Sequence, residues 1–234
     1  MRFRAAGLLA LLLAVASVVT PAVSQVQDGA TLTVLRGQVA IIRPDGSAIQ
    51  PAPSGTVVSA GDEIRTVSQT GALITFFVGT EIELGEETIL VVERVSRQGD
   101  RIDVSLKQVF GAAVHRVATF SDPGSSYRVD AGGAVALVRG TEFFVLVNPP
   151  IVVLVVKEGL VLFNGVLVGP GAYAVEIEGG RVVAGPEPFA VSSLDFNGLF
   201  EAETAARREF LDENEDDLTD EQRANRRRAE RDPD

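Results

Sequence analysis

The stretch TILVVERVSRQGDRIDVSLKQV, residues Thr88–Val109, holds two β-type runs on either side of a short polar segment. In the second run, apolar and polar residues alternate strictly from Ile102 to Lys107. A strand sends successive side chains to opposite faces, so this one should be buried on one face and solvated on the other. The segment Arg97-Gln98-Gly99-Asp100 between the runs predicts a hairpin loop joining Thr88–Val95 to Arg101–Val109.

Short β-type runs of the same kind, rich in Val and Ile, fill the chain from Leu32 to Val183. Gly, Pro, Asn or Asp separates them, and they include Leu32–Leu35, Gln38–Ile42, Ala72–Val78 and Glu81–Leu84. No long helical pattern appears before Pro188. The sequence therefore predicts an all-β domain of many short antiparallel strands. A sandwich, a barrel and a solenoid-like stack all fit, and no fixed repeat period is visible that would demonstrate a regular solenoid.

One run differs in being apolar at every position, Ile151 to Val156. A β-branched run of this kind predicts a strand covered on both faces. Helix is the competing interpretation, but Pro149-Pro150 before the run and Gly159 after it disfavour a long helix.

The first 24 residues have the features of a signal peptide. Arg2 and Arg4 precede the apolar core Leu8–Val19, and Pro21 is followed by the small residues Ala22-Val23-Ser24. This pattern predicts cleavage after Ser24 and a periplasmic or secreted protein, with contact to the membrane only if the segment stays uncleaved as an anchor. The β domain would then occupy residues 25–188.

The character of the sequence changes in residues 189–234. Ser192 and Asp195 have the spacing of a helix start, and an apolar stripe follows at helical spacing, formed by Phe196, Leu199, Phe200, Ala206, Phe210 and Leu211. Thr219 and Gln222 repeat the start pattern. The remainder is rich in charge, which predicts a partly disordered helical tail that docks on a partner or folds back over a sheet edge.

Composition excludes several functions. The net charge is −11, and removal of Arg2 and Arg4 with the signal peptide makes it more negative, which argues against binding to nucleic acid or to an anionic membrane. Cysteine is absent, which removes thiol catalysis and Cys-based metal sites.

The candidates for chemistry are few. His115 is the only histidine, too few for a His-rich metal site, and no Gly-x-Ser-x-Gly pattern accompanies it. The cluster Glu81, Glu83, Glu86 and Glu87 could supply paired carboxylates for glycoside hydrolysis, although acids on strands and turns usually solvate the surface. The acidic segment 212–220 is similar to a calcium loop, but Asp217 replaces the turn glycine and Arg223 the bidentate glutamate. We predict no catalytic residue, no cofactor and no metal.

The order of the glycine-bounded strands resembles the FecR domain family over roughly Leu32 to Val183. Two segments carry most of this resemblance: Gly61-Asp62-Glu63-Ile64-Arg65-Thr66 resembles the family's Gly-Asp-x-Ile-x-Thr, and Arg139-Gly140-Thr141-Glu142-Phe143-Phe144-Val145 resembles its Arg-Gly-Thr-x-Phe-x-Val. Further matches in the same order are Gly37-Gln38-Val39, Gly71–Leu84, Glu158-Gly159-Leu160-Val161 and Pro170-Gly171-Ala172-Tyr173.

The resemblance implies an extracytoplasmic β domain without catalysis. The best-known members of the family pass an iron-siderophore signal to a sigma factor. Only a signal peptide precedes the β region here, so the module carries over and the sigma-factor pathway is in doubt. The signature residues are Gly61, Asp62, Thr66, Arg139, Gly140, Thr141, Phe143 and Gly159. We expect Gly140 and Thr141 to fix a corner of the framework, with Arg139 bonded to a carboxylate or to backbone carbonyls. Ligand binding by Arg139 is the alternative.

The sequence therefore predicts an exported, non-enzymatic binding, scaffold or signalling module of the bacterial cell envelope, with a protein partner and no nucleic acid. A polysaccharide-binding module and a hydrolase with an unrecognised site are the alternatives. The absence of Trp and the presence of only two Tyr weigh against sugar stacking.

Overall fold

The computed structural model describes residues 29–77, 79–177 and 181–186, and these residues form an all-β protein. The expected signal peptide and the expected C-terminal helices lie outside the described residues. No helix within the described ranges has the length and hydropathy needed to span a bilayer.

The strands form two facing sheets. Sheet A contains, in spatial order, β4 (Val57–Val58), β1 (Ala30–Arg36), β6 (Gly71–Thr75), β7 (Glu81–Leu84), β9 (Arg101–Val117), β12 (Thr141–Asn148), β13 (Ile151–Glu158), β16 (Ala172–Ile177) and β17 (Arg181–Pro186). Sheet B contains β3 (Ala48–Ile49), β2 (Val39–Ile42), β5 (Glu63–Thr66), β8 (Ile89–Gln98), β9, β10 (Ser126–Ala131), β11 (Ala134–Val138), β14 (Val161–Phe163) and β15 (Val166–Val168). All pairings are antiparallel except that of β9 with β10.

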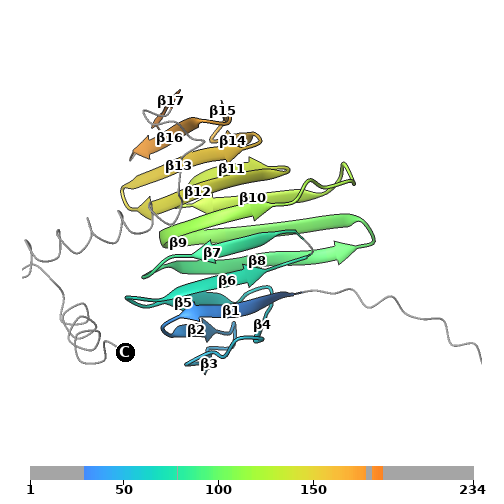
Figure 1. The fold of residues 1–234 in the computed structure, drawn as a ribbon, viewed down its shortest axis with the longest axis vertical. Helices are drawn as coiled ribbons and strands as arrows, with labels where there is room; N and C mark the ends of the chain where they lie inside the picture. Colours follow the sequence, from blue (N-terminus) through green and yellow to red (C-terminus); the bar gives the residue numbers. More distant parts are fainter. Residues whose placement is uncertain (1–28, 78, 178–180, 187–234) are drawn as a thin grey trace, which may run out of the picture.

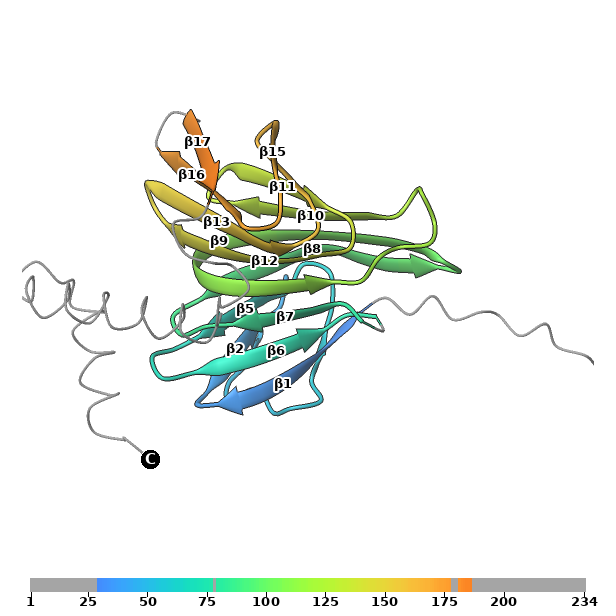
Figure 2. The same ribbon diagram turned by 45° about the horizontal axis from the view of Figure 1, so that its top comes forward.

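Chain order alternates between the sheets, usually one hairpin at a time. The hairpins β10–β11 and β14–β15 lie in sheet B, and β12–β13 and β16–β17 lie in sheet A. The strands stack along the long axis of the molecule, from β3 and β4 at one end to β15 and β17 at the other (Figures 1 and 2). The described chain is thus a two-layered sandwich built from successive layers of strands along its long axis, and we call each layer a rung. Its two sheets have free edges, unlike the closed sheet of a barrel.

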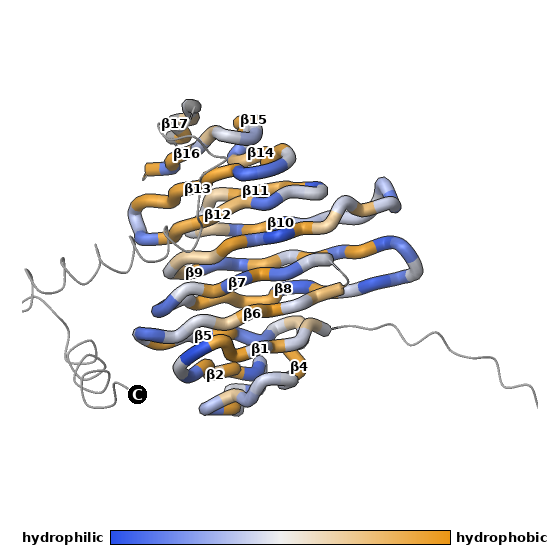
Figure 3. Tube along the Cα trace, viewed as in Figure 1, coloured by the Kyte–Doolittle hydropathy of each residue, from blue (hydrophilic) through white to orange (hydrophobic). Residues whose placement is uncertain are grey.

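Strand β9 joins the two layers. Its first part pairs with β8 and β10 in sheet B, and its second part, from Gly111 on, pairs with β7 and β12 in sheet A. The run expected at 101–109 is therefore the first part of one bent strand that continues to Val117. The loop of the β8–β9 hairpin is also shorter than expected, since Arg97 and Gln98 still pair with β9. This hydrophilic tip projects from the side of the stack (Figure 3).

One continuous apolar core fills the space between the sheets. The alternation in β9 holds, with Val104 and Leu106 fully buried. The expectation for Ile151–Val156 was only partly right, because the face of β13 turned away from the core is unevenly covered. Val155 on that face is buried, Val153 is half-buried and Ile151 is 44% exposed.

Candidate functional site

The Arg-Gly-Thr segment lies at a corner where the chain enters β12. Gly140 has a φ of +70°, a conformation that favours glycine, and a Cβ there would stand 3.1 Å from Thr119 Cα. Arg139 donates from a guanidinium nitrogen to the Phe120 carbonyl at 3.0 Å, and the Thr141 hydroxyl donates to the Leu160 carbonyl at 3.2 Å. Of the partners considered for Arg139, the structure thus shows a backbone carbonyl.

Gly159 belongs to the same corner. Its φ is +80°, and a Cβ on it would lie 3.0 Å from Thr141 Cα. Phe143, two residues into β12, is fully buried in the core. The signature residues at this end of the molecule therefore hold neighbouring rungs together, and their polar groups are directed at the backbone.

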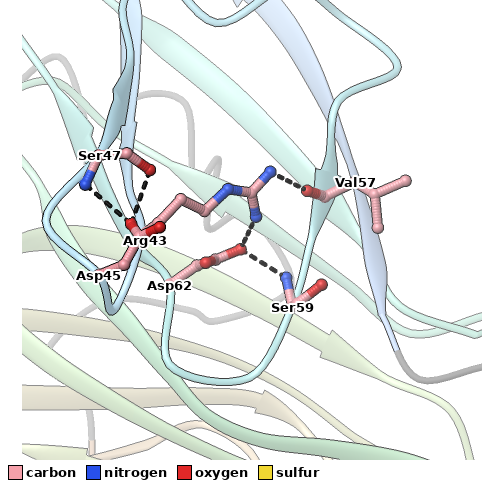
Figure 4. Close-up of polar contacts among 6 residues, drawn as sticks. All are labelled: Arg43, Asp45, Ser47, Val57, Ser59 and Asp62. Carbon is pink, nitrogen blue, oxygen red and sulfur yellow. Dashed lines mark hydrogen bonds and ion pairs between the residues drawn. The ribbon is translucent and has the colours of Figure 1, made fainter.

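The Gly-Asp segment makes a second anchor, at the other end of the stack (Figure 4). Gly61 has a φ of +89° and packs against Pro44, whose Cγ would be 2.6 Å from an added Cβ. Asp62 is only 1% exposed; its carboxylate accepts from the Ser59 amide at 2.7 Å and pairs with the Arg43 guanidinium. A buried carboxylate is tolerated when it is paired and hydrogen-bonded in this way.

Asp62 also fixes the loop around it, because Arg43 donates to the Val57 carbonyl at 3.2 Å. The turn at Pro44-Asp45-Gly46 closes with Gly46 at a φ of +83°. Asp45 accepts from the Ser47 hydroxyl and amide, and the hydroxyl in particular holds the pKa of this exposed carboxyl below its usual value.

Thr66 completes the segment by bonding both ends of the turn between β7 and β8. Its hydroxyl donates to the Gly85 carbonyl at 2.7 Å and accepts from the Thr88 amide at 2.8 Å. The Thr88 hydroxyl in turn accepts from the Ala112 amide and donates to the Ala112 carbonyl, each at 3.1 Å. The Thr70 hydroxyl likewise accepts from the Gln38 amide at 3.1 Å and donates to the Gln38 carbonyl at 3.2 Å.

These threonines reveal a repeated corner that the sequence analysis missed. A glycine with positive φ lies against a threonine of the adjacent rung, in the pairs Gly37–Thr70, Gly111–Thr88, Gly140–Thr119 and Gly159–Thr141. In three of them the threonine hydroxyl donates to the carbonyl of the residue after the glycine. The sequence signal for such a corner is a Gly and a Thr near the ends of two strands. The two residues are 18 to 33 positions apart, and either of them can come first in the chain. No fixed spacing therefore reveals the corner.

His115 is fully buried in the core between Tyr127 and Phe143. Its Nδ1 lies 2.8 Å from the Tyr127 hydroxyl, and its ring stacks on Phe143 at a centroid distance of 4.7 Å. Burial lowers the pKa of His115 to about 3 and raises the pKa of Tyr127 well above its ordinary value. A neutral imidazole closed off from solvent is a packing residue with one polar partner.

The four glutamates do not converge. Glu83 pairs with Arg116 at 3.0 Å on the surface of sheet A, whereas Glu86 is buried in a turn and accepts from the Gln69 amide at 2.7 Å. Within the described part of the chain, no group of three or more acidic or imidazole side chains is arranged to hold a metal ion. The acidic segment 212–220 lies outside that part.

The outer face of sheet B carries a row of exposed leucines, which we call the leucine row. Leu137, Leu162 and Leu167 lie directly opposite one another on β11, β14 and β15. They are 42%, 39% and 64% exposed, respectively. Arg128 on β10 continues the row beyond Leu137. Side chains in register on neighbouring strands touch, so the three leucines form one apolar patch.

The family model described as FecR protein matches residues 62–162. Two crystal structures of a "putative anti-sigma factor" from Parabacteroides distasonis ATCC 8503 match with a TM-score of 0.43 at 18% identity, over 53% of this chain and 59% of theirs. The chain thus spans less than two thirds of that protein. No curated protein matches the sequence.

Proposed function

We propose, from the match of residues 62–162 to the FecR family model, that the chain is an exported, non-enzymatic module of the cell envelope that binds another protein and takes part in signalling. The leucine row carries this proposal. Exposed apolar side chains that adjoin one another typically mark a contact surface, whereas single exposed ones are ordinary.

The surroundings of the leucine row support a protein partner. The row ends at β15, which is the edge strand of sheet B within the described residues, and an edge strand offers backbone groups that a partner can pair with. At its other end, Arg128 offers a cation beside the apolar surface. The matching partner presents an apolar strand or loop with a carboxylate at one side.

The pattern of residues 1–24 supports export. The roles of the side chains that could have served in catalysis support a non-enzymatic function. His115 is enclosed in the core, and Asp62 and Arg139 are engaged with the framework. The described part of the chain offers contact surfaces and rigid corners.

The test is capture of envelope proteins by the full chain and by two variants. Leu162→Glu places a charge at the centre of the leucine row, and Val67→Glu places one at an apolar residue outside the leucine row that is 49% exposed. We expect a protein captured by the parent chain and by Val67→Glu to be lost with Leu162→Glu. Capture that is insensitive to Leu162→Glu, or capture of no protein, would refute the proposal.

A further inference from the structure

The outer face of sheet A carries a second apolar patch, which we call the outer apolar face. It consists of Ala112, Val114, Phe144, Leu146, Val153, Val155 and Tyr173 on β9, β12, β13 and β16. Val114, Phe144, Val155 and Tyr173 lie opposite one another in sequence across the four strands. Their chain neighbours Ala113, Val145 and Val156 belong to the core between the sheets, so the outer apolar face points away from that core.

This face is buried although no described strand lies over it. Val114 is 0% exposed and Phe144 is 3% exposed. The leucine row has an equivalent position on sheet B, and its members are 39% to 64% exposed. Large apolar side chains on the outside of a sheet of this molecule can therefore stay in contact with solvent. The outer apolar face is buried, so something must cover it.

We infer that this cover is the chain's own segment Ser192–Leu211, packed as an amphipathic helix. The point where the described chain ends supports this choice. Strand β17 is the edge of sheet A beside β16, and its last residue, Pro186, pairs with Ala172, next to Tyr173. The segment therefore starts within reach of the outer apolar face, since the five residues 187–191 extend at most about 17 Å.

Length and pattern fit as well. Twenty residues make a helix of about 30 Å, and four strands of a sheet span about 14 Å. The stripe Phe196, Leu199, Phe200, Ala206, Phe210 and Leu211 supplies the apolar surface. The N-terminal segment is a poor rival, because β1 is separated from β12 by β6, β7 and β9 and only four residues would precede Gly29 after cleavage behind Ser24.

The charges beside the face favour an apolar cover over a charged one. Glu142 lies between Arg116 at 3.4 Å and Lys157 at 3.1 Å, and Arg116 also pairs with Glu83 at 3.0 Å. These groups largely neutralise one another.

The test uses the absence of cysteine from the chain. Val155→Cys in the full chain reports on the outer apolar face, and Leu137→Cys on an open face. We expect a maleimide to label Cys at position 155 at least tenfold more slowly than Cys at position 137. Adding Phe196→Asp and Phe200→Asp should raise the rate at 155 several-fold, whereas Ala205→Asp, on the opposite side of the helix, should leave it unchanged.

Equal rates at 155 with and without the two aspartates would overturn the inference, and so would protection that fades on dilution, which would identify a second copy as the cover. Cooperative thermal unfolding, followed by far-UV circular dichroism, reports whether the variants stay folded. If the double variant unfolds, Phe200→Ala takes its place and should increase labelling at 155 but not at 137. The inference does not depend on the proposed function, which concerns the other sheet.

Discussion

At the scale of the residue, the glycine–threonine corners make a sharp prediction. Gly111 and Gly55 have nearly the same φ, +86° and +88°, but a Cβ on Gly111 would lie 2.6 Å from Thr88 Cα, and a Cβ on Gly55 would meet nothing within 4 Å. Gly55→Ala should lower the free energy of unfolding by about 1 kcal/mol through backbone strain alone. Gly111→Ala should lower it by about 3 kcal/mol or more, because the clash adds to the strain. Urea denaturation measures both, and equal losses would contradict a packing role for the corner.

His115 predicts a pH dependence of stability. Its pKa of about 3 in the folded protein is below the ordinary value of 6.5, so the unfolded chain binds the extra proton between these values. The stabilising contribution is therefore complete above pH 6.5 and is lost as the pH falls toward 3, by up to about 1.4 kcal/mol per pH unit. His115→Gln keeps a polar partner for Tyr127 but does not titrate. Its unfolding free energy should fall less steeply than that of the parent between pH 6 and 4, and parallel curves would disprove the assignment.

Sequence reasoning at this scale succeeded where a short segment determines the geometry. Gly140 was expected at a corner of the framework, and it has a positive φ there because the strand end requires it locally. The partners Thr119 and Phe120 of the Arg-Gly-Thr corner could not be predicted, because stacking of rungs brings them there from another strand. The burial of His115 was also beyond reach, since alternation in the run 111–117 is hidden by apolar residues on both faces.

At the scale of the element, the bend of β9 depends on Gln108. This side chain is fully buried where β9 passes from sheet B to sheet A, and its Nε2 donates to the Gly111 carbonyl at 2.7 Å and to the Val145 carbonyl at 3.2 Å. Gln108→Met should lower the free energy of unfolding by roughly 1–3 kcal/mol, because both carbonyls lose a donor. Gln98→Met, at the exposed hairpin tip, should change it by less than about 0.5 kcal/mol. Thermal unfolding compares the two, and similar losses would show that Gln108 does not secure the bend.

The sequence predicted the elements better than their continuity. The predicted run Glu81–Leu84 has the same bounds as β7. Its polar and apolar residues alternate and Gly-Thr and Gly flank it, so a short strand is the one structure that the pattern indicates. The strand expected to end at Val109 continues instead to Val117, because the chain only bends at Gly111 and exchanges partners. The single parallel pairing, β9 with β10, follows from the same bend and has no local signal.

At the scale of the whole molecule, β9 and the continuous core should make the stack unfold as one unit. Ile41 on β2 and Phe163 on β14 lie near opposite ends of the stack, yet both are fully buried members of the same core. Truncation of either to Ala should destabilise by roughly 3–5 kcal/mol.

Because β9 pairs with both sheets, we expect Ile41→Ala and Phe163→Ala to shift a single transition rather than melt one end. In a Tyr173→Phe background, Tyr127, buried on β10 near the middle, is the one tyrosine that gives a near-UV signal in a chain without tryptophan, and far-UV circular dichroism follows all strands. The two signals should coincide in both variants. A far-UV transition that precedes the Tyr127 transition in either variant would instead show that the rungs unfold independently from the ends, as in an extended repeat protein.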